Sequence, residues 1–168
     1  MTHVTRLCAA VLLLAGVTAL RSQTKDEKPF NDADFVKIAA SAGMHEVEIS
    51  KLAQTKARND AVKKFAETLV NDHTKINDAL KAAAKDANIP VPDKLLDEHQ
   101  KEVDMFREYK GTNFDVDFVK HQVKDHEQAV ALFTRATKEA KNEKIKDFAT
   151  KYLPTLQSHL EQAKKLQP

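Results

Sequence analysis

Hydrophobic residues recur every three to four positions along most of the chain from residue 31 onward, which is the spacing of amphipathic α-helices. Short polar segments that contain Asn, Gly or Pro interrupt this pattern and mark the ends of helices. Asn or Asp stands where each long helix is expected to begin, and these residues favour helix N-termini. The pattern predicts helices over about residues 31–57, 59–87, 93–109, 113–140 and 142–166.

The two long helical hairpins of this prediction resemble copies of one another. When the sequence is shifted by 83 positions, Phe35 aligns with Phe118 and Asn59 with Asn142, and no gap is needed. Two hairpins joined by a long crossover form one of the four-helix-bundle topologies, which ferritin-like proteins use. We therefore predict an all-α, ferritin-like four-helix bundle with a short extra helix in the crossover. The alternative is an ordinary five-helix bundle whose Ala- and Lys-rich helices match by chance.

Composition and charge agree with a helical protein that does not bind nucleic acid. Three glycines, no tryptophan and many Ala, Lys, Asp and Glu residues favour helix over sheet. The 27 basic and 25 acidic residues are interspersed and leave a net charge of +2. The sequence has no basic stripe with interleaved aromatic residues, so nucleic acid is not an expected partner.

The first 19 residues have the features of a secretory signal peptide. Arg6 precedes the apolar run LCAAVLLLAGVTAL, and Val17 and Ala19 provide small residues before a cleavage site. The run is short for a membrane span, and an uncleaved anchor is the alternative. Cleavage removes Cys8, the single cysteine, and leaves no transmembrane segment in the mature protein. We predict a signal peptide over residues 1–19, a flexible linker over 20–30 and the helical bundle over 31–168.

Four polar residues fall on the inward faces of the four long helices. Glu46, His73, His126 and His159 come one from each helix. Counted from the two hairpin turns, their depths differ by at most about six residues, or roughly 9 Å along a helix. Because neighbouring helix axes lie about 8–10 Å apart, these side chains can meet in the core. His45 competes with Glu46 for the inward position of the first helix.

Such a layer must satisfy its own polar atoms, because an unpaired polar group is costly to bury. One solution is a single transition metal ion (Zn, Fe, Mn or Cu) bound by the one carboxylate and three imidazoles. In this solution Asp72 orients His73 or ligates from the edge, and His45 is a further accessory ligand. The other solution is a metal-free network in which Glu46 accepts from protonated histidines, which would make a buried pH-sensitive clasp.

The sequence does not indicate an enzyme. A ferritin-like di-iron centre needs Glu-x-x-His on two helices, but Val70, Val123 and Leu156 stand three residues before the core histidines. No Gly-rich phosphate loop, Gly-x-Ser-x-Gly elbow or cysteine nucleophile is present, so we assign no catalytic and no other cofactor-binding residue. His121 and Asp125 form either a rim site or, more simply, exposed helix positions, and His99 is expected to be solvated.

Three segments carry a specific combination of motifs: HEVEISKLAQTKARNDAVKKFAETLVNDHTKIND, GTNFDVDFVKHQVKDHEQAVALF and YLPTLQSHLEQA. They contain Glu-Val-Glu from Glu46, Asp-His-Thr around His73, Phe-Asp followed by His126, and Leu-Pro-x-Leu-x-x-His ending at His159. This combination resembles a family of exported bacterial proteins that contain a domain of unknown function. Its members have a ferritin-like helical bundle and are often labelled predicted outer membrane proteins.

The resemblance covers about residues 30–166 and implies a fold and export, without an established reaction or ligand. The family often has Tyr in place of Phe118 and Gly in place of Ser50, and neither change touches the polar layer. It implies a mature protein in the periplasm or associated with the outer membrane.

Two functions remain open at this stage. The first is an envelope protein that binds a transition metal for storage, sensing or protection. The second is a non-catalytic structural or stress-related bundle with a metal-free Glu/His layer. A separate hypothesis is that the polar crossover binds a partner helix or an envelope or membrane surface.

Overall fold

Each of the four long helices begins directly after an asparagine that caps it. In the computed structural model, which describes residues 28–168, the side chains of Asn31, Asn59, Asn113 and Asn142 each accept a hydrogen bond from a backbone N–H of the following first turn. These bonds satisfy amides that a helix start leaves unpaired. The long helices are α1 (Asp32–Lys56), α2 (Asp60–Asp86), α4 (Phe114–Glu139) and α5 (Glu143–Leu166).

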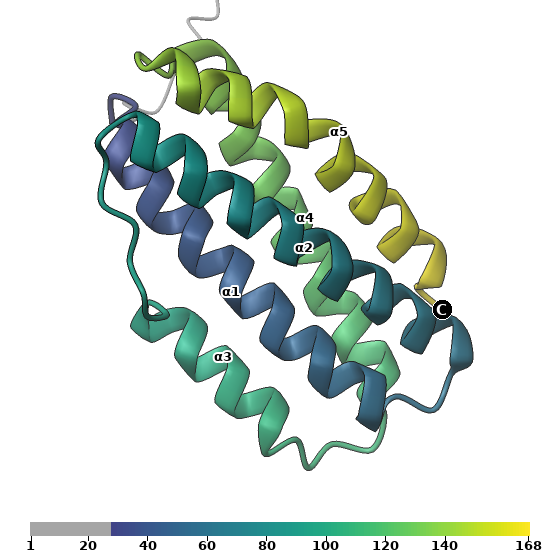
Figure 1. Ribbon diagram of the computed structural model, residues 1–168. Coiled ribbons are helices and arrows are strands. Elements are labelled where there is room, and N and C mark those ends of the chain that lie inside the picture. Colours follow the sequence, from purple (N-terminus) through teal and green to yellow (C-terminus); the bar gives the residue numbers. More distant parts are fainter. Residues whose placement is uncertain (1–27) are drawn as a thin grey trace, which may run out of the picture.

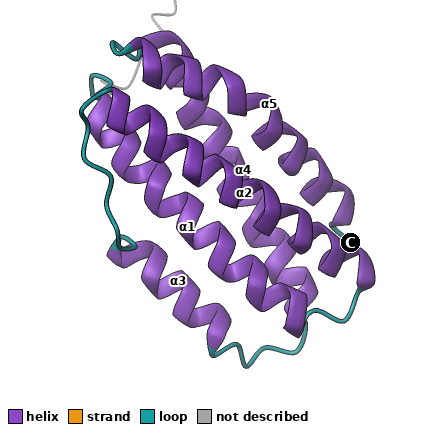
Figure 2. Cartoon of the chain, viewed as in Figure 1, coloured by secondary structure: helices purple, strands orange, loops and turns teal. Residues whose placement is uncertain are grey.

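The long helices form a bundle of two hairpins (Figure 1). α1 packs against α2 and α4 against α5, and the hairpins meet where α2 contacts α5 and α1 contacts α4. Short loops close both hairpins, whereas a long connection joins α2 to α4 (Figure 2). The predicted all-α bundle of two hairpins and a crossover is therefore confirmed.

The crossover carries the short helix α3 (Asp97–Arg107), which lies along α1 (Figure 1). This helix starts four residues later than the sequence pattern predicts. The backbone N–H of Leu96 donates to Ser41 Oγ (2.8 Å), and Leu96 has an extended backbone, so this bond holds the residue before α3 against α1. Val103 and Phe106 are the buried residues of α3, and they fix it to the bundle.

The internal repeat reappears in the hydrogen bonds between the two hairpins. Asp32, at the start of α1, accepts from the backbone N–H groups of residues 141–142 in the α4–α5 turn, at 3.2 and 2.8 Å. Asp115 stands 83 positions later, at the start of α4, and accepts from residues 58–59 in the α1–α2 turn, at 3.0–3.2 Å. Each hairpin thus holds the turn of the other through the same pair of contacts.

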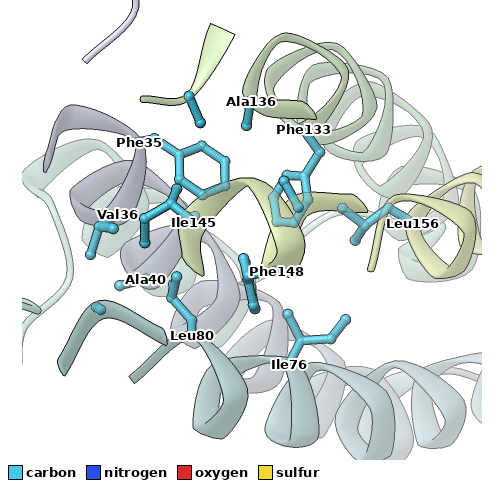
Figure 3. Packing of buried hydrophobic residues seen from close by; sticks show 14 residues of the cluster. Phe35, Val36, Ala40, Ile76, Leu80, Phe133, Ala136, Ile145, Phe148 and Leu156 are labelled. Atoms are coloured by element: carbon cyan, nitrogen blue, oxygen red, sulfur yellow. The ribbon is translucent and has the colours of Figure 1, made fainter. Parts of the chain in front are cut away.

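Apolar side chains form two clusters, one toward each end of the bundle. Figure 3 shows the first cluster, in which the ring of Phe35 packs edge-on against Phe133 with the centroids 5.2 Å apart. Phe106 and Phe118 belong to the second cluster. The repeat relates the clusters, since Phe118 occupies in the second the position that Phe35 occupies in the first.

The predicted signal peptide and most of the predicted linker lie outside the described residues. Both stay predictions. Among residues 28–168, no helix combines the length and apolar character that crossing a membrane requires.

Removing either carboxylate that spans the hairpins is expected to destabilise the bundle. Asp32→Ala and Asp115→Ala each take the acceptor from two backbone amides of a turn. We expect each variant to lose about 1–2 kcal/mol of unfolding free energy, measured by urea denaturation with circular dichroism. The two losses should add in the double variant, because the residues lie at opposite ends of the bundle.

Asp78→Ala is the matched control. Asp78 is an exposed carboxylate in the middle of α2, 3.8 Å from Lys81. Its removal should change stability by no more than about 0.5 kcal/mol. An equally small effect at Asp32 and Asp115 would show that these contacts do not hold the hairpins together.

Candidate functional site

A layer of polar side chains separates the two apolar clusters. On every long helix, buried polar residues stand between a position of the first cluster and a position of the second. The four predicted site residues all lie in this layer. Its buried members are His45 and Glu46 on α1, His73 on α2, Gln122 and His126 on α4, and His159 on α5.

His73, His126 and His159 converge in the interior from three different helices. One ring nitrogen of each lies within 4.8 Å of those of the other two. The ring centroids are 5.3–5.5 Å apart, and the Nε2 atoms of His73 and His126 are 3.4 Å apart. The structure thus brings together three of the four residues that the sequence assigned to one site.

The hydrogen bonds of two of these imidazoles define which nitrogen carries the proton. Nδ1 of His126 faces the backbone carbonyl oxygen of Gln122 at 3.0 Å, and a carbonyl can only accept. Neutral His126 therefore has its lone pair on Nε2. Nε2 of His159 donates to Asp72 Oδ2 at 3.2 Å, which leaves the lone pair of His159 on Nδ1. Within the described residues this Nδ1 atom is buried and has no hydrogen-bond partner.

This arrangement suits a transition metal ion that is bound by imidazole nitrogens. Ligating histidines commonly donate their second ring N–H to a carbonyl or carboxylate, as His126 and His159 do here. Two nitrogens bound tetrahedrally at about 2.0–2.1 Å from zinc lie about 3.3 Å apart, close to the 3.4 Å between His73 and His126. An ion would also give the orphaned nitrogen of His159 a partner.

Burial keeps the three imidazoles uncharged. It lowers the pKa of His73 well below its usual value and that of His126 to about 4, and the neighbouring imidazoles add to the effect at both. Burial also lowers the pKa of His159, although Asp72 opposes the shift. Neutral imidazoles are the form that binds metals, so none of the three imidazoles has to lose a proton near neutral pH.

Glu46, the fourth predicted ligand, lies beside the three imidazoles. Its Oε2 accepts from Gln122 Nε2 at 2.9 Å, and its Oε1 is 3.9 Å from Nδ1 of His126. Burial and the nearby Asp125 raise the pKa of Glu46 to about 8, so the carboxyl group is mostly protonated at neutral pH. Gln122 thus supports both Glu46 and His126. Its position one turn before His126 on the inward face was the sequence signal for this role.

The two predicted accessory residues take different places. Asp72 contacts His159, whereas the sequence placed it beside His73. His45 is buried but lies with His121 and Asp125 on the side of α1 that faces α3 and α4. The side chain of His99, expected to be solvated, is half-buried and stacks on His45.

A cavity of about 430 Å³ adjoins the layer and has walls of two kinds. Glu46, His73 and His126 line one part of it. Apolar or small residues of the four long helices also line it: Gly43, Ile76, Ala129 and Leu156. Ile38 also lines the cavity and is 40% exposed.

The apolar lining is the repeat-related copy of the polar layer. A shift of 83 positions relates Glu46 to Ala129, His73 to Leu156, Gly43 to His126 and Ile76 to His159. The fold therefore accommodates small or apolar residues at these positions, and the polar copy is not required for packing. Departures of this kind from the local rules of a fold are expected at functional sites.

The family of this chain follows from a comparison of its sequence with known families. A profile described as a domain of unknown function, DUF4142, matches residues 16–166. The chain belongs to the DUF4142 family. The resemblance to a family of unknown function with a helical bundle is thereby confirmed, and no curated protein matches the chain.

A solved structure that matches this DUF4142 protein has the same fold. It is described as CopM in the Cu(I)-bound form, and the two chains share 18% sequence identity with a TM-score of 0.67. The match covers 81% of this chain and 94% of that one. At this identity the likeness establishes the shared helical-bundle fold.

Glu46→Gln is expected to stabilise the metal-free protein increasingly as the pH rises. The folded pKa of Glu46, raised from 4.5 to about 8, means that the folded state keeps a proton that the unfolded state releases between these values. This group therefore lowers wild-type stability as pH rises, and Gln removes the effect. We expect the stability difference between variant and wild type to grow by about 3–5 kcal/mol from pH 4.5 to pH 8.

Urea denaturation of both proteins at several pH values, with chelator present, measures this difference. Glu48→Gln is the control, because Glu48 lies on the same helix with its side chain about half exposed. The control should show no comparable trend. A pH-independent difference at Glu46 would mean that its carboxyl group ionises normally in the folded protein.

Proposed function

We propose that this protein binds a transition metal ion in the core of its bundle through His73, His126 and His159. The observation that carries the proposal is the convergence of three uncharged imidazoles. In His126 and His159, one ring nitrogen donates a hydrogen bond, which leaves the lone pair on the other nitrogen. The unpartnered Nδ1 of His159 supports it, since buried polar atoms normally have partners.

Among the ions considered, the donor set suits zinc, copper and iron better than manganese. Imidazole nitrogen suits Zn, Cu, Fe and Ni, whereas Mn prefers oxygen ligands. A structure of the same fold was solved with Cu(I) bound, which is a reason to test copper alongside zinc. Three neutral imidazoles bring no negative charge, so the ionised form of nearby Glu46 is the group that can balance the ion or complete its coordination.

The role that we propose is to bind a transition metal ion in the cell envelope, for storage, sensing or protection. It does not require a reaction, and we assign no catalytic residue. The alternative is a metal-free layer that fixes helix register. The 3.4 Å contact between the Nε2 atoms of His73 and His126 favours this alternative if one of them carries a hydrogen.

Metal titration of the chelator-treated protein separates the two functions. We expect the wild type to bind Zn²⁺ or Cu⁺ and to melt at a higher temperature, with a gain of about 2.7 kcal/mol at one hundred times the dissociation constant. His73→Ala and His126→Ala should each lose the metal ion that binds at the inner site. Equilibrium dialysis and elemental mass spectrometry measure the number of ions bound per chain.

Leu69→Ala controls for the loss of packing. Leu69 is fully buried one turn before His73 on α2, so its truncation leaves a comparable cavity and all three imidazoles. This variant should be less stable yet still bind the ion. If neither wild type nor variants take up metal and added ions leave the melting temperature unchanged, the layer is a hydrogen-bond network.

Export is the second part of the proposal and rests on the N-terminal sequence. Cleavage after Ala19 would give a mature protein that begins at Leu20. We expect N-terminal sequencing of protein from the periplasmic or outer-membrane fraction to start there. An intact N-terminus in the cytoplasmic fraction would contradict export.

A further inference from the structure

His45 belongs to a second cluster of metal-binding side chains on the other side of α1. Its partners are Glu102 of α3 and His121 and Asp125 of α4. One nitrogen or oxygen atom of each residue lies within 4.8 Å of those of the other three. Three helices that are distant in sequence thus bring two imidazoles and two carboxylates to one place.

The contacts among these atoms centre on Nε2 of His121. It lies 2.9 Å from Asp125 Oδ2, 3.4 Å from Nε2 of His45 and 3.9 Å from Glu102 Oε2. Nε2 of His45 is also 3.4 Å from Glu102 Oε2. These separations scatter around the spacing of about 3.3 Å between ligand atoms that are bound tetrahedrally about 2.0–2.1 Å from a metal.

Hydrogen bonds alone leave conflicts in this cluster. If His121 donates to Asp125 and His45 donates to Glu102, both Nε2 atoms carry hydrogens and face each other at 3.4 Å. The lone pair on Nδ1 of His45 then points toward the Asp125 carboxylate, 3.7 Å away. If His45 instead carries its proton on Nδ1, its Nε2 can accept from His121, but the same lone pair faces Glu102 Oε2 at 3.4 Å. A cation between the four side chains removes these conflicts, because all four groups then direct lone pairs at the ion.

Burial makes His45 a preformed ligand. Its side chain is 2% exposed, and burial lowers the pKa of His45 to about 3 although Asp125 acts in the opposite direction. The remaining members become more exposed toward the surface: 10% for His121, 15% for Asp125 and 29% for Glu102. An ion can therefore reach the cluster from solvent.

We propose that His45, Glu102, His121 and Asp125 form a second metal site, which takes a divalent transition cation such as Zn²⁺. The two carboxylates supply negative charge that a divalent ion can balance. Their oxygen atoms also suit Mn, in addition to the Zn and Fe that imidazole nitrogen suits. The second site does not depend on the function proposed for the inner one.

Neighbouring side chains hold the ligands of the second site in place. His99 stacks on His45 with the ring centroids 5.2 Å apart, and Nδ1 of His99 lies 2.6 Å from Ser41 Oγ. Lys124 approaches Oε1 of Glu102 at 3.8 Å and leaves Oε2 for the cluster. Supporting contacts of this kind orient metal ligands.

The second site and the inner layer adjoin the same cavity. His45 and Asp125 line it together with His73 and His126. An ion at the second site would therefore lie between α1, α3 and α4, next to the cavity that the inner imidazoles also line. This placement predicts two separable binding events in one protein.

Calorimetric titration of the chelator-treated protein with Zn²⁺ tests the proposal. The wild type should bind one zinc ion per chain at the second site. Glu102→Gln and His121→Ala should each weaken this binding at least about tenfold, the range seen when even supporting residues of metal sites are changed. Both variants should leave zinc binding at the inner site, which depends on His126, unchanged.

Glu127→Gln is the control, because it removes an exposed carboxylate from α4 that pairs with Lys164. It should bind zinc like the wild type. Circular dichroism establishes folding, and Glu102→Gln decides if His121→Ala fails to fold, since Glu102 is the most exposed of the four ligands.

These measurements test the second site independently of the inner site. Loss of a zinc equivalent in Glu102→Gln but not in Glu127→Gln supports the second site, even if His126→Ala has no effect and the inner site fails. Unchanged stoichiometry and affinity in both Glu102→Gln and His121→Ala would overturn it. A wild-type protein that binds no zinc would overturn the second site, whereas the inner site is decided by the zinc and copper titrations together.

Discussion

The cost of burying polar groups is the constraint on which this structure depends. Five ionisable side chains, four imidazoles and one carboxyl, lie in the interior of a small bundle, where each must find a partner or remain uncharged. The bundle confines them to one layer and places an apolar cluster on each side. The clusters hold the helices at a fixed spacing, so the layer must satisfy its polar atoms from its own members and from polar residues at its edge, such as Asp72 and Glu102.

The helices and their pairing were predictable because their signals are local. Asparagine caps, the helical period of apolar residues and the short hairpin turns lie within a few residues of the features that they determine. The repeat added the long-range information, since two copies of one hairpin have to bury the same face. The contacts of Asp32 and Asp115, each made to the turn of the other hairpin, are the structural counterpart of that repeat.

The details of the site were only partly predictable, because they depend on rotation about a helix axis and on a segment without a repeat. His45 and Glu46 are adjacent in sequence, and periodicity alone could not assign the inward position to one of them. The structure buries both, on different sides of α1. Glu102 carried no signal, since α3 is polar, lies in the crossover and has no equivalent in the other half of the chain.

The two clusters differ most in charge, and this difference determines which ions they suit. The inner imidazoles are neutral, and Glu46 beside them keeps its proton at neutral pH, so the inner set attracts a cation only through nitrogen lone pairs. The outer set has two carboxylates, and hydrogen bonding to His121 helps to hold the pKa of Asp125 below its usual value despite burial. A divalent cation is therefore balanced in the outer set at once. In the inner set the same ion would need Glu46 to release its proton, so binding there should be coupled to proton release.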